Sequence, residues 1–265
     1  MTRLQGAHVL ITGAASGIGR LMALGARDRG ARLTLLDRDG AGLAAVLAEL
    51  GEGHAGYAVD LADRAATLAA ADQVLRERGP VEVLVNNAGI VTGRPILDCS
   101  EDAIERTFRV NTLALFWLTR AFLPGMLAQG RGHVVTLASA AGLGGTSRLT
   151  DYCASKFAAV GFDESLRLEL KRLGHPVRTT LVCPFYIDTG MFAGVRTRFP
   201  WLLPILRPEY VARRVLGAVA SNRKRLILPR FVLAVLAVKV LPPTLYDAIL
   251  GFFGVNRTMD EFRGR

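Results

Sequence analysis

A buried strand, a glycine-rich turn and a helix follow one another at the start of the chain. Residues 7–11 predict the strand, the turn carries Gly13, Gly17 and Gly19, and the helix is predicted to end near Arg29. Glycines allow the backbone to approach a phosphate closely, and the free N–H groups at a helix start favour negative charge. A glycine motif alone is weak, but the strand before it and the helix after it favour a pyrophosphate-binding turn over a turn that serves only packing.

Strand and helix signals continue to alternate after this turn. The further predicted strands lie at residues 32–36, 56–61, 81–85, 134–138 and 178–183. Alternation of this kind predicts an α/β fold, a Rossmann-type doubly wound parallel sheet of about seven strands flanked by helices, with functional residues at the carboxyl ends of the strands. We expect a catalytic domain over residues 1–229 and an apolar C-terminal extension over residues 230–265.

Acidic residues end the second and third predicted strands. Asp37 lies about 20 residues beyond the glycine turn, where a carboxylate accepts hydrogen bonds from the adenosine ribose hydroxyls and repels a 2′-phosphate. Asp37 therefore favours NAD over NADP. Arg38 beside it could pair with that phosphate, so NADP remains possible. Asp60, at the end of the third strand, could hydrogen-bond the adenine edge.

A hydroxyl, a phenol and an ammonium occur close together at residues 139–156. Ser139 ends a predicted strand, and Tyr152 and Lys156 are four residues apart on one face of a predicted helix. A neighbouring cation favours the phenolate of a tyrosine, whose reference pKa is about 10, so Tyr152 is a candidate general acid/base. For an isolated pair with this spacing, a surface contact is the more common interpretation, because spacing alone shows neither matched pKa values nor geometry.

Two further polar amides occur among apolar residues. Asn87 belongs to an Asn-Asn pair directly after the strand at 81–85, and taken alone this pair favours simple turn chemistry. Asn111 lies within a long predicted helix over 101–129, where a polar amide either satisfies a backbone group or binds an ordered water.

Taken together and in this order, the motifs resemble the classical short-chain dehydrogenases/reductases over about residues 4 to 230. They are Thr12 to Gly19, Asp60-Leu61, Asn86 to Gly89, Asn111, Ser139, Tyr152 with Lys156, and Pro184 to Thr189. The resemblance implies a catalytic tetrad of Asn111, Ser139, Tyr152 and Lys156. In that tetrad Ser139 holds the substrate oxygen and Tyr152 moves the proton. Lys156 lowers the phenol pKa and binds the nicotinamide ribose, while Asn111 keeps a water in a proton relay.

The resemblance also implies which residues contact the cofactor and the substrate. The cofactor residues are Gly13, Ser16, Ile18, Asp37, Asp60, Leu61, Asn87, Tyr152, Lys156, Ile187 and Thr189. Motifs after residue 187 are similar to the branch of retinol dehydrogenases/retinal reductases and hydroxysteroid dehydrogenases, whose substrates are lipophilic. The expected substrate contacts are Ser139, Leu143, Tyr152, Phe185, Tyr186, Met191 and Phe192. Val195, Phe199 and Trp201 extend this apolar set, and we expect about half of the apolar members to be ordinary packing residues.

The expected activity is hydride transfer between a nicotinamide cofactor and a lipophilic alcohol or carbonyl of retinoid, steroid or fatty alcohol type. One alternative is a small polar or acyl-thioester substrate, which the apolar residues after Ile187 disfavour. The other is a non-catalytic dinucleotide-binding sensor. An intact Ser139, Tyr152 and Lys156 argue against a sensor, because a binding protein needs no proton donor.

The chain after Pro229 is apolar for much of its length, but its longest uninterrupted apolar run is about ten residues, and a membrane-spanning helix needs about 20. We favour contact with an anionic membrane surface, because basic residues such as Arg230 and Lys239 flank the apolar run. The alternative is that this segment covers the substrate pocket of its own chain or packs on a second subunit. The resemblance further implies a homodimer or homotetramer, with the helices that contain Asn111 and Tyr152 as contact surfaces.

The formal net charge is +10, from 33 Lys and Arg against 23 Asp and Glu. The excess is scattered arginine without a nucleic-acid motif, so an anionic cofactor or a membrane surface is favoured over nucleic acid. The isolated cysteines and histidines predict reduced thiols and no metal site. Because the first strand begins almost at once, we expect neither a signal peptide nor an amino-terminal anchor, and a cytoplasmic location with peripheral membrane contact left open.

Overall fold

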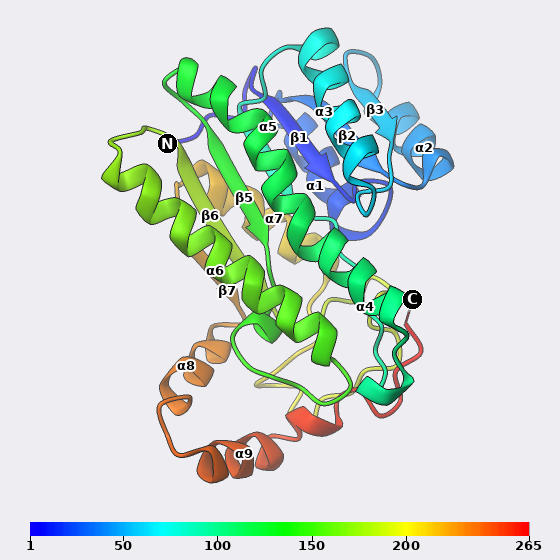
Figure 1. The fold of residues 1–265 in the computed structure, drawn as a ribbon, viewed down its shortest axis with the longest axis vertical. Helices are drawn as coiled ribbons and strands as arrows, with labels where there is room; N and C mark the ends of the chain where they lie inside the picture. Colours follow the sequence, from blue (N-terminus) through cyan, green and yellow to red (C-terminus); the bar gives the residue numbers. More distant parts are fainter. Residues whose placement is uncertain (265) are drawn as a thin grey trace.

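Within the described residues, 1–264, seven parallel strands form one sheet in the order β3-β2-β1-β4-β5-β6-β7 (Figure 1). This computed structural model confirms the predicted Rossmann-type sheet. The strands are β1 (His8–Thr12), β2 (Arg32–Asp37), β3 (Ala55–Ala58), β4 (Val83–Asn86), β5 (His133–Leu137), β6 (Arg178–Pro184) and β7 (Arg225–Leu228). From β1 to β3 successive strands are added on one side of the sheet, and from β4 to β7 they are added on the other, so the strand order changes direction between β1 and β4. In such sheets, ligands bind in the crevice outside the carboxyl ends of the strands at this point.

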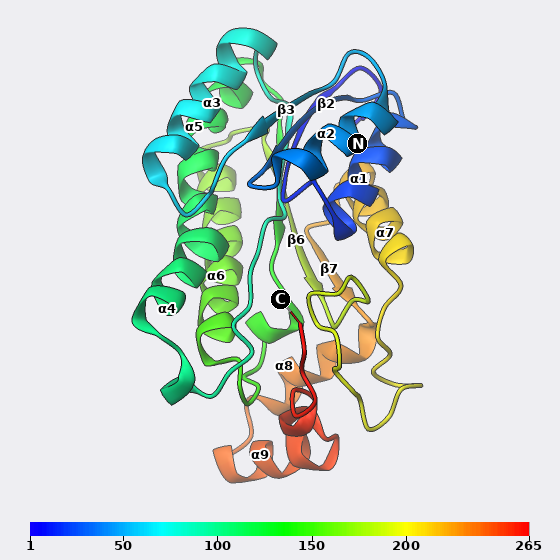
Figure 2. The same cartoon turned by 90° about the vertical axis from the view of Figure 1, so that its right-hand side faces the viewer.

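Helices cover both faces of the sheet (Figure 2). On one face lie α1 (Gly17–Arg27), α2 (Gly40–Leu50) and α7 (Pro208–Ala220), and on the other lie α3 (Arg64–Arg78), α5 (Ala114–Ala128) and α6 (Thr150–Arg172). Strand β1 contributes side chains to the hydrophobic cores on both faces of the sheet. Val9 and Ile11 pack in the core with α1 and α7, whereas Leu10 packs in the core with α3, α5 and α6. Because successive strand side chains alternate between faces, a strand covered on both sides reads as a continuous apolar run.

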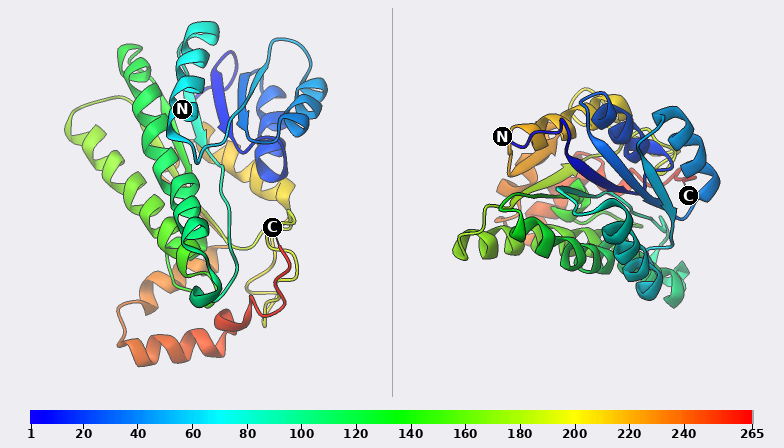
Figure 3. Two further views of the ribbon diagram at one scale, coloured as in Figure 1. Left: turned by 45° about the vertical axis from the view of Figure 1, so that its right-hand side comes forward. Right: turned by 90° about the horizontal axis from the view of Figure 1, so that it is seen from above.

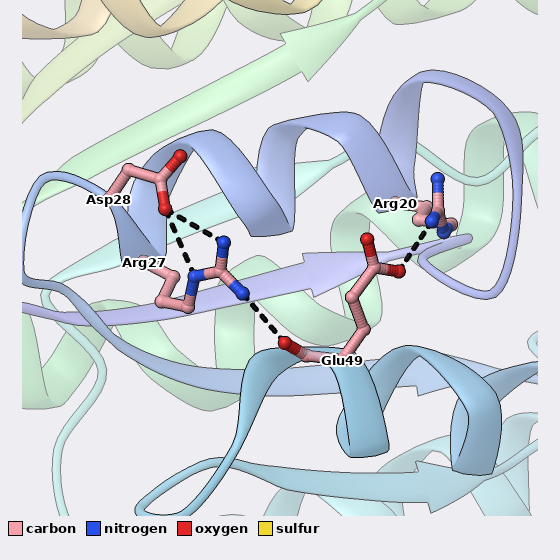
Figure 4. A network of polar contacts seen from close by, with 4 residues as sticks. All are labelled: Arg20, Arg27, Asp28 and Glu49. Atoms are coloured by element: carbon pink, nitrogen blue, oxygen red, sulfur yellow. Dashed lines mark hydrogen bonds and ion pairs between the residues drawn. The ribbon is translucent and has the colours of Figure 1, made fainter.

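Helices α1 and α2 are also linked at the surface (Figure 4). The Arg27 guanidinium donates to Asp28 Oδ1 at 2.9 Å and to the Glu49 carbonyl oxygen at 2.7 Å, and Arg20 pairs with the Glu49 carboxylate. Exposed ion pairs of this kind contribute about 0–1 kcal/mol each. The buried face of α1, which includes Met22 and Ala26, therefore does more to fix this helix against the sheet.

The long helix predicted over 101–129 is interrupted. It consists of α4 (Glu101–Phe108), one π-helical turn over Arg109–Leu113, and α5. π-Helical turns inside α-helices often occur at functional sites. Residues 101–128 are the one helical segment of the described chain that is long and apolar enough to cross a membrane, and half of its most apolar window is buried inside the protein. Its position against the sheet identifies α5 as a core helix.

The C-terminal extension folds back onto the chain. After a 3-10 turn over Arg230–Leu233, it forms α8 (Ala234–Val238) and α9 (Pro243–Phe252), which lie beyond the carboxyl ends of the strands (Figures 1 and 3). From there, the last residues return toward the sheet. Met259 is fully buried among residues that include Leu149 and Tyr152. The extension thus packs against the part of the chain predicted to hold the active site.

Candidate active site

The glycine turn after β1 is tightly packed against the turn after β4. A Cβ on Gly13 would lie 2.8 Å from the Cα of Ala88, and Gly13 has a φ of +64°, a conformation that favours glycine. The Asn87 side-chain amide donates to the carbonyl oxygens of Thr12 at 2.8 Å and Gly13 at 3.1 Å. Asn87 therefore braces the glycine turn rather than forming a turn of its own.

The start of α1 is suited to an anion. Helices α2 and α3 begin with Asp39 and Asp63, whose carboxylates cap the first-turn N–H groups, whereas Ser16 at the start of α1 makes no such side-chain bond. Among the described residues, the first N–H groups of α1 therefore have no side-chain acceptor, and the helix dipole favours negative charge there. Because this uncapped helix follows the glycine turn, the residues present fit the pyrophosphate of a dinucleotide.

Asp37 ends β2 at the edge of the same crevice. Its two carboxylate oxygens accept from the backbone N–H groups of Ala15 at 2.9 Å and Asp39 at 3.1 Å, which fixes the orientation of the carboxylate. Arg38 lines the crevice beside it. Asp37 and Arg38, the two residues expected to determine whether NAD or NADP binds, therefore both line the crevice.

Asp60 is held by other groups of the chain. Burial raises the pKa of this carboxyl, but the Ala62 N–H at 3.0 Å and the Arg106 guanidinium at 2.8 Å outweigh that effect and leave the pKa below its ordinary value. Both carboxylate oxygens therefore have partners within the protein. Arg106, on α4, is a crevice residue that the sequence interpretation missed, since nothing in its local pattern separates it from a surface arginine.

Tyr152 and Lys156 lie one turn apart on α6, and both are almost fully buried. The Lys156 ammonium donates to the Leu137 carbonyl oxygen at 2.9 Å and lies 5.7 Å from the centre of the Tyr152 ring. Ser139 begins the turn after β5, where its hydroxyl accepts from the Ala141 N–H at 3.1 Å. Three of the four predicted catalytic residues, Ser139, Tyr152 and Lys156, therefore line one crevice at the carboxyl ends of β5 and β6.

Burial governs the protonation of these groups. It raises the pKa of the Tyr152 phenol, and the hydrogen bond with Ser139 lowers that pKa by a smaller amount. Burial also lowers the pKa of the Lys156 ammonium to about 8. The phenol is therefore neutral at physiological pH in the protein alone, and is suited to donate a proton to a substrate oxygen.

Asn111 occupies the π-helical turn and is buried. Its amide accepts from the Ile90 N–H at 2.8 Å and donates to the Ile90 carbonyl oxygen at 2.9 Å, so it satisfies both backbone groups of that residue. A Cβ on Gly89 would lie 3.4 Å from both Asn111 Oδ1 and Lys156 Nζ. The Asn111 and Lys156 side chains thus both lie next to Gly89, although Asn111 is not among the crevice residues.

A second, apolar cavity adjoins this crevice at Ser139 and Tyr152. Its aromatic wall is made by Phe185, Tyr186 and Phe192, whose rings pack edge to face with centres 4.6 and 5.0 Å apart. The opposite wall comes from the C-terminal extension and includes Phe231, Val232, Ala234, Val235, Val238, Tyr246, Ile249, Leu250, Phe253 and Val255. The extension therefore covers an apolar pocket of its own chain, which was the less favoured of the two expectations.

The residues expected to contact the cofactor all line the crevice, whose volume is about 940 Å³. Two expected substrate residues differ from the rest. Met191 lines the crevice rather than the apolar pocket, and Leu143 lines neither. Leu143 is buried in a core cluster with Ala159 and Leu181, because the 3-10 turn over Ala140–Gly142 directs it away from the pocket.

The comparisons with known proteins agree with this geometry. The family model described as short chain dehydrogenase matches residues 7–199, which is more than half of the chain. The chain belongs to the short-chain dehydrogenases. Members of this family bind a nicotinamide cofactor, and the enzyme is an NAD(P)-dependent oxidoreductase that acts on alcohols.

Curated short-chain dehydrogenases match over nearly the whole chain. Epidermal retinol dehydrogenase 2 of Mus musculus is 45% identical over 269 residues, covering 99% of this chain and 87% of the relative. Retinol dehydrogenase 10 of Homo sapiens is 39% identical over 291 residues, covering 98% and 85%. These matches confirm the predicted place of the chain in the retinol dehydrogenase branch.

Solved short-chain dehydrogenases share the fold. A structure from Burkholderia phymatum in complex with NAD has a TM-score of 0.82 and 29% identity, and covers 92% of this chain and 96% of its own. A metagenomic short-chain oxidoreductase in complex with NADP has a TM-score of 0.72 and 33% identity, and covers 86% and 98%. The two neighbours hold different dinucleotides, so similarity of fold does not determine whether a chain binds NAD or NADP. That preference depends on the residues around the cofactor.

Proposed function

We propose that this short-chain dehydrogenase interconverts a lipophilic alcohol, of retinoid, steroid or fatty alcohol type, and its carbonyl compound. One observation carries the proposal: Ser139 and Tyr152 border both the polar cofactor crevice and the apolar pocket. An apolar pocket with a few convergent polar groups selects an apolar substrate and orients its reacting oxygen. The names of the matching retinol dehydrogenases support the same substrate class.

In the proposed mechanism, the Ser139 hydroxyl holds the substrate oxygen and Tyr152 transfers the proton. The neutral phenol gives its proton to a carbonyl oxygen in reduction and takes it from the hydroxyl in oxidation. Lys156 holds its charge beside the phenol and would bind the nicotinamide ribose, while Asn111 fixes the Ile90 backbone and would keep a water in the relay. When bound, the nicotinamide supplies or accepts the hydride.

We propose NAD as the preferred cofactor. The first N–H groups of α1, with Gly13, Ser16 and Ile18, would hold the pyrophosphate, and the oriented Asp37 carboxylate would accept from the ribose hydroxyls. A 2′-phosphate would meet that carboxylate, and this repulsion disfavours NADP. Arg38 is the residue through which NADP would still be accepted.

The test is turnover of an alcohol panel, followed by the absorbance of reduced nicotinamide, with NAD and NADP supplied separately. Retinoid, steroid and long-chain fatty alcohols are compared with short polar alcohols. We expect turnover of bulky apolar alcohols, faster with NAD. Turnover of polar alcohols alone would overturn the proposed substrate class while leaving the family assignment intact.

We further propose that the enzyme is cytoplasmic and docks on an anionic membrane surface through its extension. Residues 196–257 hold eleven Lys or Arg and two acids, so this segment carries most of the net charge. Trp201 is 80% exposed, Val240 85% and Phe252 60%. Such residues beside the apolar pocket would enter the interface and give a lipophilic substrate direct access.

Flotation with anionic and neutral liposomes tests membrane docking. The double variant Trp201→Glu, Phe252→Glu should lose most binding to anionic vesicles, because it puts two negative charges on the docking surface. Leu173→Glu, an exposed leucine beyond the end of α6, is the matched control and should float like the parent. Equal flotation of the double variant and the parent would contradict the proposal.

We propose that the enzyme forms homodimers or homotetramers through the outer face of α5 and α6. This face exposes Phe116, Phe157 and Leu168. Exposed apolar side chains on two long neighbouring helices are typical of an interface between subunits. Leu168→Glu should shift the sedimenting species toward the monomer in analytical ultracentrifugation. A parent chain that sediments as a monomer at micromolar concentration would refute the proposed assembly.

A further inference from the structure

Three tyrosines line the apolar pocket, and they differ in their hydrogen bonds. Tyr152 interacts with Ser139, and the Tyr186 hydroxyl lies 2.8 Å from the Thr258 hydroxyl. The hydroxyl of Tyr246, on α9, is buried and has no partner among the described residues. Buried polar groups are nearly always hydrogen-bonded, so an exception inside a ligand pocket calls for a partner that a ligand supplies.

The position of Tyr246 is set by a glycine across the pocket. A Cβ on Gly144 would lie 2.9 Å from the Tyr246 hydroxyl oxygen and 3.0 Å from Val235 Cγ1, so the phenol occupies the space that a side chain at 144 would fill. Gly144 belongs to the turn that begins at Ser139, and its N–H group reaches the Ala140 carbonyl oxygen at 3.3 Å. The mostly apolar wall of the pocket therefore carries the Ser139 and Tyr152 hydroxyls at one place and the Tyr246 hydroxyl at another. Its other polar residues are Thr146 and Tyr186, and the Tyr186 hydroxyl is already paired with Thr258.

The charge of the pocket limits what can bind Tyr246. Its lining residues in the described chain are all uncharged. A carboxylate or ammonium placed there would be desolvated without an opposite charge, which is strongly unfavourable. Burial also raises the pKa of the Tyr246 phenol, which keeps the hydroxyl protonated and able to donate. The fitting partner is an uncharged oxygen, a hydroxyl or a carbonyl.

We infer that Tyr246 is a specificity-determining residue that binds a second, uncharged oxygen of the substrate. The preferred substrate is then a lipophilic alcohol or carbonyl with two oxygen functions, one reacting at Tyr152 and one held by Tyr246. This inference rests on the proposed function and narrows its substrate class. A site built to hydrogen-bond a substrate oxygen discriminates against the analogue that lacks it, because the site's own polar group is then left unpaired.

Matched pairs of alcohols test the inference. One pair is retinol and 4-hydroxyretinol, and the other is an androstane 3-alcohol and the corresponding 3,17-diol. We expect the parent enzyme to favour the member with two oxygens in at least one pair by about 10-fold in kcat/KM, the effect of roughly one hydrogen bond. Tyr246→Phe should abolish that preference and leave kcat/KM for the mono-alcohol within about two-fold.

Two further variants make the result specific. Tyr210→Phe removes a phenol hydroxyl on α7, outside the pocket, and should change neither member of a pair. Gly144→Ala should displace the phenol and reduce the preference as Tyr246→Phe does. Melting temperatures of all three variants show whether each one is folded.

Each outcome separates the inference from the proposed function. Equal kcat/KM for both members of each pair in the parent, or an equal loss for both in Tyr246→Phe, would overturn the role of Tyr246 and leave a lipophilic alcohol as substrate. Failure of the parent to turn over any lipophilic alcohol would overturn the proposed function, and the inference with it.

Discussion

Replacing Tyr152 with phenylalanine should lower kcat by about 10³-fold and leave dinucleotide binding nearly unchanged, since general acid/base groups contribute 10²–10⁴-fold. The variant removes the proton donor and keeps the ring. The ring packs edge to face against Phe192 with centres 5.7 Å apart, so the shape of the pocket should persist. The measurements are turnover of a lipophilic alcohol and titration of NADH fluorescence.

Tyr210→Phe is the control, because it removes a hydroxyl of the same kind from a residue that does not line the crevice. Its turnover should match that of the parent. Equal turnover of Tyr152→Phe and the parent would show that another group moves the proton. Loss of NADH binding in Tyr152→Phe would instead show that its hydroxyl acts mainly in cofactor binding.

Replacing Gly19 with alanine should weaken NADH binding by at least about 100-fold and lower the free energy of unfolding by about 1–3 kcal/mol, the usual cost of overpacking. The added Cβ would collide with the Gly13 carbonyl oxygen and lie 2.7 Å from Asn87 Nδ2. Gly13 belongs to the glycine turn, and Asn87 braces that turn. The turn must therefore shift, and the N–H groups at the start of α1 shift with it.

Gly217→Ala provides the matched control for this substitution. Gly217 lies in the interior of α7, and a Cβ there would meet no atom of the described chain within 4 Å. Alanine should leave NADH binding unchanged and stabilise the helix by up to about 1 kcal/mol. Denaturant unfolding and NADH titration measure both effects. Normal NADH binding by Gly19→Ala would contradict the role assigned to the glycine turn.

The features that the sequence predicted are those that depend on local pattern. A strand, a glycine turn and a helix follow directly along the chain, so the start of the fold could be inferred from residues 7–29. The contacts of Gly13 with Ala88 and Asn87 could not, because those two residues follow β4. The alternation of strands and helices likewise predicts that Asp37 and Ser139 lie along the same edge of the sheet, at the carboxyl ends of the strands.

Features that depend on contacts between distant parts of the chain could not be predicted from the sequence. An apolar segment such as the extension can be buried equally well by a membrane, a partner or its own chain, and only the folded chain shows it against the pocket of Ser139. The π-helical turn at Asn111 was also missed, because apolar periodicity does not distinguish it from an unbroken α-helix. Leu143 was predicted to contact the substrate because it lies close to Ser139 in sequence, but its side chain is buried in a core cluster.

The two described ends of the chain lie at opposite ends of the sheet. Thr2 is tied to His133, at the start of β5, by a hydrogen bond of 2.9 Å, whereas Arg263 lines the cofactor crevice and its N–H donates to the Ala193 carbonyl oxygen at 2.8 Å. The described C-terminal end therefore lies beside the mouth of the active site. For purification or imaging, an affinity tag or fluorescent protein belongs at the amino end, where it is far from the substrate's route.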